Sequence, residues 1–228
     1  MRVISIFICV FLCGSLSEAC AEDITPSFSQ KLDIQVRYDN RSNRPSREQY
    51  RLRYYPSLAL TSTWSVNSFI VTGDDFSSSH NTFGSDTTDY LYARRLYLRH
   101  ETNAGKTELG IIPTYKGRVS STGLSKDGWI TGIRHVRKLQ NNTALEIVVG
   151  QLANAEASEA FNVGEEDEYF EIEYSAKMGE RHSYEASFER MLNGTFARAE
   201  YRFRINEEDT AFVELVQRTD ESAAKIVV

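Results

Sequence analysis

Charged residues recur at every second position in several segments of this chain, and they are of the types that bind ions and charged solutes. Between residues 197 and 205, small, aromatic and aliphatic residues alternate with Arg198, Glu200, Arg202 and Arg204. Two preceding segments alternate apolar residues with glutamates in the same way. An arginine row can bind carboxylate or phosphate groups through paired hydrogen bonds, and rings of charge select ions in pores. These segments therefore predict recognition of charged solutes.

The alternating segments supply two sets of candidate site residues. If the charged faces line one water-filled space, the basic residues of that lining are Arg37, Arg51, Arg53, Arg95, Arg99, Arg198, Arg202 and Arg204. The acidic residues are Glu146, Glu171, Glu173, Glu185 and Glu189. In a closed ring the last strands lie beside the first, so we expect a wall that is basic on one side and acidic on the other. The alternative is that these charges neutralise one another in a packed interior.

Catalysis and metal binding have weaker support. His182 is followed by Ser183, but none of the four histidines has the spacing of a known lipase or deacylase motif. Acidic residues at 74, 75 and 86 and at 165–167 could hold Ca²⁺ through oxygen ligands, but they form no ladder of fixed spacing. We therefore expect solvated acidic loops, no catalytic residue, no metal, no cofactor and no enzymatic activity.

The N-terminus predicts export. Arg2 is followed by an apolar run too short to span a bilayer and by the small-residue site Ala19-Cys20-Ala21, as in a secretory signal peptide cleaved after residue 21. A lipoprotein cleaved before Cys20 is the alternative, but Glu18 puts a charge where such sites have small or apolar residues. All three cysteines lie in this segment, which excludes a disulfide-stapled domain from residues 22–228. The net charge of −6 argues against a nucleic-acid partner.

Twelve segments of residues 22–228 have strand character. They are 32–39, 50–60, 64–72, 95–99, 106–112, 129–137, 145–149, 170–175, 184–189, 197–205, 211–215 and 225–228. Tight turns follow the second, fourth, sixth, eighth and tenth strands, whereas longer polar loops at 40–48, 73–88, 113–128 and 153–167 follow the first, third, fifth and seventh. Two later connections, at 193–194 and 219–223, are shorter.

Strand alternation alone fits two fold classes. In a soluble sandwich or lipocalin-like barrel the apolar face is the core, whereas in a transmembrane barrel it faces lipid and the charged face lines the lumen. The placement of long loops at one end is typical of a transmembrane barrel with short periplasmic turns. We therefore predict an all-β, antiparallel, up-and-down transmembrane β-barrel of about twelve strands.

The run Thr107-Glu108-Leu109-Gly110-Ile111-Ile112-Pro113, followed by a loop to Trp129, resembles porins of Gram-negative bacteria. The strand number is also similar to that of small oligosaccharide-specific porins, although no specific motif of theirs is present. The resemblance covers residues 22–228 in pattern. It implies a passive diffusion channel in the outer membrane, with membrane lipid, the barrel assembly machinery and small hydrophilic solutes as partners. The arginine row favours anionic or sugar-acid solutes.

The C-terminal residue departs from the porin pattern. Porins of this type usually end on an aromatic residue, whereas this chain reaches Val228 after only a few residues of its twelfth strand. We expect either a sequence cut short of its closing strand or an unusual closure.

A non-conducting barrel with an adhesive or structural role through its external loops is the alternative function. In a channel, the loop from Gly73 or that from Pro113 would fold inward and narrow the passage.

Overall fold

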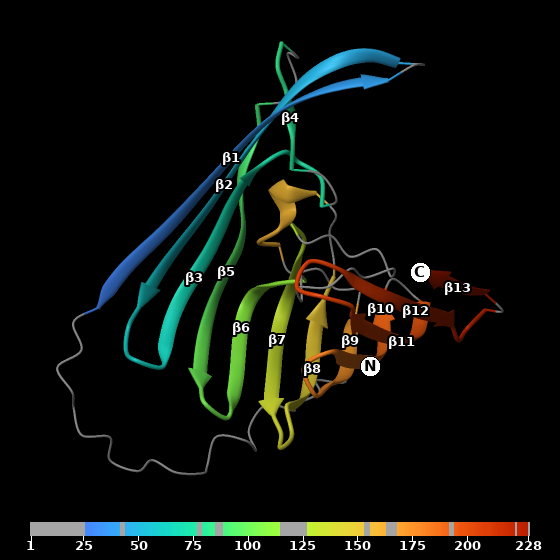
Figure 1. The fold of residues 1–228 in the computed structure, drawn as a ribbon. Helices are drawn as coiled ribbons and strands as arrows, with labels where there is room; N and C mark the ends of the chain where they lie inside the picture. Colours follow the sequence, from blue (N-terminus) through green and yellow to red (C-terminus); the bar gives the residue numbers. More distant parts are fainter. Residues whose placement is uncertain are drawn as a thin grey trace, which may run out of the picture.

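The computed structural model describes residues 26–41, 44–76, 79–84, 89–114, 127–152, 156–162, 168–191, 194–221 and 223–227. They form one antiparallel sheet in which each long strand pairs with the next along the chain (Figure 1). The strands are β1 (Ser27–Arg41), β2 (Arg44–Ala59), β3 (Trp64–Thr72), β5 (Leu91–Thr102), β6 (Gly105–Pro113), β7 (Trp129–Lys138), β8 (Thr143–Gln151), β9 (Glu168–Met178), β10 (His182–Met191), β11 (Gly194–Arg204), β12 (Thr210–Arg218) and β13 (Ala223–Val227). The two-residue strand β4 (Asn81–Thr82) pairs with β2, and a short 3₁₀ helix, η1 (Ala157–Glu159), precedes β9.

The all-β, antiparallel, up-and-down fold is confirmed, and each of the twelve predicted strands has a counterpart. The sheet is not closed, because no pairing joins β1 to β13 within the described residues. No helix of the described residues is long and apolar enough to cross a membrane. The predicted signal peptide, residues 1–21, lies outside the described residues.

The connections at the two ends of the sheet differ in length. At one end, called the turn end here, residues 60–63, 103–104, 139–142, 179–181 and 205–209 join successive strands. At the opposite end, the loop end, the long connections are 73–90, 114–128 and 152–167. The turn at 139–142 is tight because Asn141 and Asn142 both adopt positive φ angles, of 58° and 57°, as in a type I′ hairpin.

The expected loop at 40–48 is wrong. β1 extends to Arg41 and β2 begins at Arg44, so the hairpin continues through most of this polar segment. Cross-strand contacts explain why polar residues remain in strand conformation here: Arg37 donates two hydrogen bonds to the Gln49 side chain, at 2.9 and 2.7 Å, and Arg47 pairs with Asp39 at 3.0 Å. Such opposite pairs stabilise a sheet by roughly 0.2–1 kcal/mol each.

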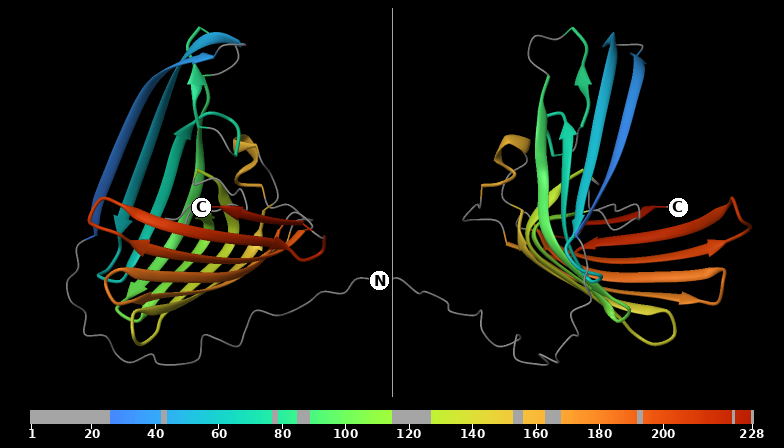
Figure 2. Two further views of the ribbon diagram at one scale, coloured as in Figure 1. Left: turned by 45° about the vertical axis from the view of Figure 1, so that its right-hand side comes forward. Right: turned by 90° about the vertical axis from the view of Figure 1, so that its left-hand side faces the viewer.

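The two ends of the sheet curl toward the same side, so that the molecule is an open trough (Figure 2). A row of glycines, Gly110, Gly132 and Gly150, crosses three neighbouring strands in register. A Cβ at Gly132 would lie 2.2 Å from the Val149 carbonyl oxygen, and Gly110 has a φ of 124°. Glycine in this row therefore allows the neighbouring backbones to approach closely on a curved sheet.

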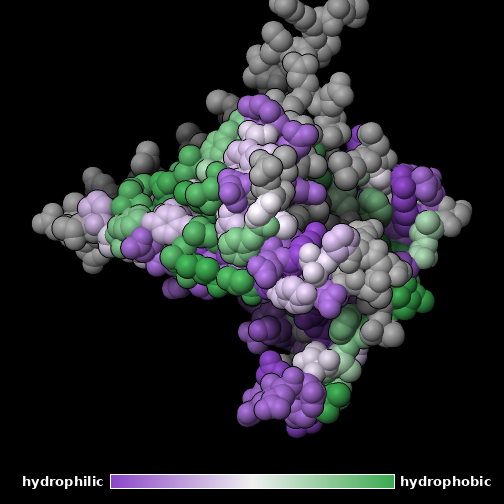
Figure 3. Space-filling view, turned by 90° about the horizontal axis from the view of Figure 1, so that it is seen from above, coloured by the Kyte–Doolittle hydropathy of each residue, from purple (hydrophilic) through white to green (hydrophobic). Residues whose placement is uncertain are grey.

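The two faces of the trough have opposite character. On the convex face large apolar side chains are exposed, such as Ile34 at 66% and Leu109 at 55%, whereas on the concave face Glu108 and Glu214 are completely buried. The view from above shows apolar and hydrophilic side chains in separate areas of the surface (Figure 3). An apolar cluster on the concave side, near the loop end, contains Ile112, Ile130, Val148, Leu152, Tyr169 and Met191.

Candidate functional site

All the charged residues that the sequence predicts to line one space lie on the same face of the sheet. The register shows this directly, because each cross-strand pair puts its two side chains on one face. Arg99 is opposite Glu108, Glu108 is opposite Arg134, and Glu171 is opposite Glu189. The row continues to β11, where Arg198 is opposite Ser187 of β10. The face that carries these residues is the buried, concave one.

The arginines of β1–β5, namely Arg37, Arg51, Arg53, Arg95 and Arg99, form the first half of this lining, which is called the arginine half below. Arg37 is exposed and Arg51 is partly covered, whereas Arg53 and Arg95 are buried at 6% and 7% exposure. Arg99 donates hydrogen bonds to Glu108 at 3.0 and 2.8 Å and lies over the Tyr97 ring. The structure thus brings the five predicted arginines of this half together and gives the buried ones specific acceptors.

Two loops supply acceptors for the buried arginines. Asp127 accepts a hydrogen bond from Arg53 at 2.7 Å and another from the Ser79 hydroxyl at 2.7 Å, and Arg95 donates to the Gly128 carbonyl at 2.8 Å. Burial alone would raise the pKa of Asp127, but the hydrogen bonds from Arg53 and Ser79 and the nearby guanidinium charges outweigh it and hold the pKa below its ordinary value. The described parts of the 73–90 and 114–128 loops therefore lie over the concave face.

A bulge in β5 attaches the 73–90 loop at a second point. The register between β3 and β5 shifts at Arg94, which is the extra residue of the bulge. Its side chain is completely buried and donates to the carbonyls of Asp75 at 2.7 Å, Gly73 at 2.8 Å and Thr72 at 3.2 Å. Its guanidinium carbon lies 5.6 Å from the Trp129 ring centroid. Arg94 therefore fixes the start of this loop to the sheet.

His80 lies beside the arginine half. Burial, together with the positive charges of Arg37, Arg51 and Arg53, lowers its pKa to about 4. Its Nε2 is buried and has no hydrogen-bond partner among the described residues. The packed arrangement thus favours a neutral imidazole at this position.

The second half of the lining, on β8–β12, consists mainly of glutamates and is called the glutamate half below. Glu171, Glu173, Glu185 and Glu189 are buried, and Glu146 is partly buried. Arg198 lies among them: it pairs with Glu173 at 3.2 Å, with Glu185, and with Glu214 at 3.6 Å. Arg202 pairs with Glu200 of its own strand. Arg198 and Arg202 therefore do not extend the arginine half but neutralise part of the glutamate half.

Some buried carboxylate oxygens of the glutamate half have no hydrogen-bond donor among the described residues. One oxygen of Glu189 and both oxygens of Glu214 are buried without a hydrogen bond within the described residues. Buried carboxylate oxygens normally have donors, since an unsatisfied charged group costs several kcal/mol. In the described residues no group of three or more histidine, cysteine or acidic side chains has an arrangement that could hold a metal ion.

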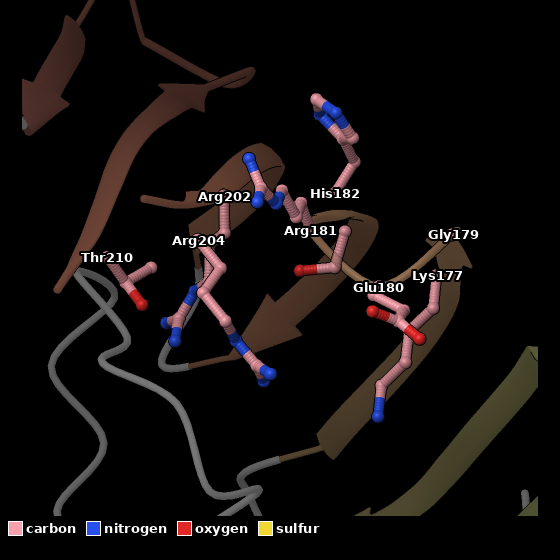
Figure 4. A pocket seen from close by; sticks show the side chains of 9 residues that line it. Lys177, Gly179, Glu180, Arg181, His182, Arg202, Arg204 and Thr210 are labelled. Atoms are coloured by element: carbon pink, nitrogen blue, oxygen red, sulfur yellow. The ribbon is translucent and has the colours of Figure 1, made fainter. Parts of the chain in front are cut away.

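A hollow of about 420 Å³ opens at the turn end of β9–β12, lined by Lys177, Gly179, Glu180, Arg181, His182, Ser183, Arg202, Arg204 and Thr210 (Figure 4). Its walls come from three strands, the 179–181 turn and the first residue of β12. Four of the lining side chains are cationic and one, Glu180, is a carboxylate. Arg204 lies opposite Thr210 and, unlike Arg198 and Arg202, forms no ion pair with a glutamate among the described residues.

Several charged residues of this lining were missed in the prediction of the site. Glu108, Glu200 and Glu214 fall on the charged side of predicted strands, so the same alternation could have identified them. Arg134 carries less signal, because Gly132 and Val136 share its face, yet it bridges Glu108 at 2.9 Å and Glu146 at 3.0 Å. No sequence pattern marks Asp127, whose role depends on how its loop folds back.

The expectation of no catalytic residue is not tested by this geometry and stays a prediction. His182 and Ser183 are neighbours on β10, but the ring nitrogen Nδ1 of His182 bonds to the Tyr201 hydroxyl at 2.6 Å. The acidic positions 86 and 165–167 lie outside the described residues. Compared with protein-family models and with curated protein sequences, the chain matches none.

Proposed function

We propose that this chain forms a β-barrel channel in the outer membrane of a Gram-negative bacterium, through which small hydrophilic solutes diffuse passively. The observation that carries the proposal is the inverted sheet, with exposed apolar side chains on the convex face and buried charges on the concave face. In water this distribution is doubly unfavourable, because it exposes a large apolar surface and buries ions. In a bilayer the apolar face meets hydrocarbon and the charged face meets a wet lumen.

The proposal includes closure of the sheet into a barrel. Unpaired backbone groups in hydrocarbon cost several kcal/mol each, so the free edges of β1 and β13 must be paired in a membrane. The inward curl of both ends of the trough supports closure, as does the up-and-down order of the strands (Figure 2). Delivery to the outer membrane would use the predicted signal peptide at 1–21 and the barrel assembly machinery.

Solute entry would be governed by the charged lining. Arg37 and Arg51, which remain partly accessible at the loop end, are suited to an anionic or sugar-acid solute because a guanidinium binds carboxylate with two parallel hydrogen bonds. The contacts of Asp127 and Ser79 with the concave face support a narrowing of the passage by the two loops. Transport by this mechanism requires no cofactor and no energy source.

A non-conducting barrel with an adhesive or structural role is the second candidate. It is favoured by contacts between loops: a β-bridge joins Asp75 to Glu156, and the Ala157 amide donates to the Asp74 carbonyl at 2.7 Å. Such contacts would give the loop end a defined surface for a partner. The two candidates differ in whether the folded protein conducts.

Reversal potentials across planar lipid bilayers test the channel and its selectivity. The protein, refolded in detergent and inserted under a salt gradient, is expected to give discrete conductance steps with an anion-selective reversal potential. Replacing two arginines of the lining, Arg95→Ser with Arg99→Ser, should shift the potential toward cation selectivity because two positive charges leave the wall. Arg137→Gln, on the opposite face of β7, is the matched control and should leave it unchanged.

Each outcome separates the alternatives. An unchanged reversal potential in the double variant would refute the role of the arginine half. A silent bilayer with protein shown to be folded by circular dichroism and by heat-modifiable gel mobility would overturn the channel and favour the adhesive barrel.

A further inference from the structure

The basic hollow at the turn end is the feature that the proposed lining explains least. The register places its side chains in two adjacent rows of the concave face. Lys177, Ser183 and Arg202 occupy one row, since Ser183 is opposite both of the others. In the next row Arg204 is opposite Thr210, and its amide donates to the Arg181 carbonyl at 2.8 Å. Four cationic side chains from neighbouring strands and one turn thus line the hollow (Figure 4).

The cations of this hollow are poorly neutralised. Within the part of the chain that the structure describes, no ion pair joins the side chains of Lys177, Arg181 or Arg204 to a carboxylate. Cationic side chains that share one hollow repel one another. A bound anion would remove this repulsion.

Arg202 differs from the other three because it is held in place. Its guanidinium bonds to the Glu200 carboxylate and lies over the Phe212 ring, 5.7 Å from the centroid. A guanidinium whose position is already fixed loses little conformational freedom on binding, which increases affinity. Ser183, between Lys177 and Arg202, adds a hydroxyl donor in the same row.

We propose that this hollow is a binding site for an anion of the phosphate type, held by Lys177, Arg181, Arg202 and Arg204. The tetrahedral charge of a phosphate can accept from several convergent donors at once, and a volume of about 420 Å³ has room for a phosphorylated group larger than the free ion. In the proposed channel the site lies at the turn end of the passage. The binding of an anion in this hollow does not depend on the proposed function. Only the role of the hollow as a binding site for a solute passing through the channel rests on it.

Calorimetric titration of the refolded protein with inorganic pyrophosphate in zwitterionic detergent tests the site. The double variant Lys177→Gln with Arg204→Gln should weaken binding roughly a hundredfold, because each of the two lost charge-assisted hydrogen bonds contributes about a factor of ten. Arg202 is left intact so that Glu200 keeps its partner and the variant folds. Arg137→Gln, near the same end but on the convex face, should bind like the parent protein.

A second titration distinguishes a free anion from a lipid headgroup. Pyrophosphate binding that the double variant loses assigns the site to a soluble phosphate. Binding only of mixed micelles containing phosphatidylglycerol, lost in the same variant, assigns it to a lipid phosphate. No binding of either probe, or equal binding by the double variant, overturns the proposal. Conductance without binding refutes this site alone, whereas binding without conductance refutes the channel alone.

Discussion

The arginine half and the glutamate half of the concave face satisfy their buried charges in different ways. In the arginine half, the two buried arginines Arg53 and Arg95 donate to a loop, through Asp127 and Gly128. In the glutamate half, Arg198 of β11 pairs with carboxylates of three strands, Glu173 of β9, Glu185 of β10 and Glu214 of β12. Buried arginines of one half therefore depend on a loop, whereas three carboxylates of the other half share one guanidinium.

This difference predicts where each half is vulnerable. Thr114, Asp127 and Gly128 of the 114–128 loop belong to no strand, so this loop can leave the concave face without breaking a strand pairing of the described residues, and its contacts suit a reversible change in the width of a passage. Arg198 cannot move away without exposing several buried carboxylates to one another. The glutamate half is therefore expected to be rigid and sensitive to substitution, and the arginine half adjustable.

The largest expected effect follows removal of the shared charge. Arg198→Gln leaves buried glutamates without their common partner and should lower the free energy of unfolding by about 3–5 kcal/mol, as for other broken buried ion pairs. Urea unfolding in lipid vesicles, followed by tryptophan fluorescence, measures the change. Arg137→Gln, an exposed position of β7, should stay within about 0.5 kcal/mol of the parent protein. A loss below about 1 kcal/mol for Arg198→Gln would show that the glutamates do not need the guanidinium.

A smaller effect on stability, but a larger one on conductance, is expected in the arginine half. Asp127→Asn keeps one acceptor oxygen but removes the charge that Arg53 and Ser79 share, which should cost about 2 kcal/mol. Because the loop is then held less firmly over the concave face, single-channel conductance should rise. Asp220→Asn, at an exposed turn between β12 and β13, is the control and should leave conductance unchanged. Equal conductance in both variants would place the loop outside the passage.

Strand positions were predictable from the sequence because each strand carries its own signal. The predicted strand at 64–72 coincides with β3, and the alternation over 197–205 covers most of β11, which ends at Arg204. The same period also predicted that Arg95, Arg99 and the glutamates share one face. β1 and β2 are longer than expected because their polar ends are stabilised by cross-strand pairs, such as Arg47 with Asp39, which alternation of hydrophobicity does not reveal.

Contacts between distant segments could not be predicted in this way. Asp127 and Arg53 are 74 positions apart, and only the folded loop brings them to 2.7 Å. The bulge at Arg94 is likewise invisible in the pattern, since Arg94 and Arg95 look alike in sequence but have different acceptors. The placement of Arg198 among glutamates follows from the register of β9–β12, whereas the sequence suggested a neighbourhood with the first strands.

The smallest expected effect is a partial loosening of the arginine half in acid. His80 has its pKa lowered to about 4 by burial and by Arg37, Arg51 and Arg53, whereas an open loop would bind a proton near the ordinary value of 6.5. The packed loop is therefore fully stable above pH 6.5 and loses stability as the pH falls from 6.5 to about 4. Asp127 stays charged throughout this range because its pKa lies below its ordinary value of 3.8, so its contact with Arg53 persists and opening is only partial.

Hydrogen exchange of residues 79–84 at pH 7.5 and 4.5, corrected for the intrinsic rate, measures this loosening. Protection in the parent protein should be lower at pH 4.5, because protonation of His80 adds a positive charge beside three arginines. His80→Gln cannot take up a proton, so its protection should be nearly the same at both values of pH. If protection in the parent protein were also equal at both values of pH, protonation of His80 would not affect the packing of the loop against the arginine half. Combined with Asp127→Asn, acid should open the loop further, since the variant removes the carboxylate that otherwise holds it to Arg53.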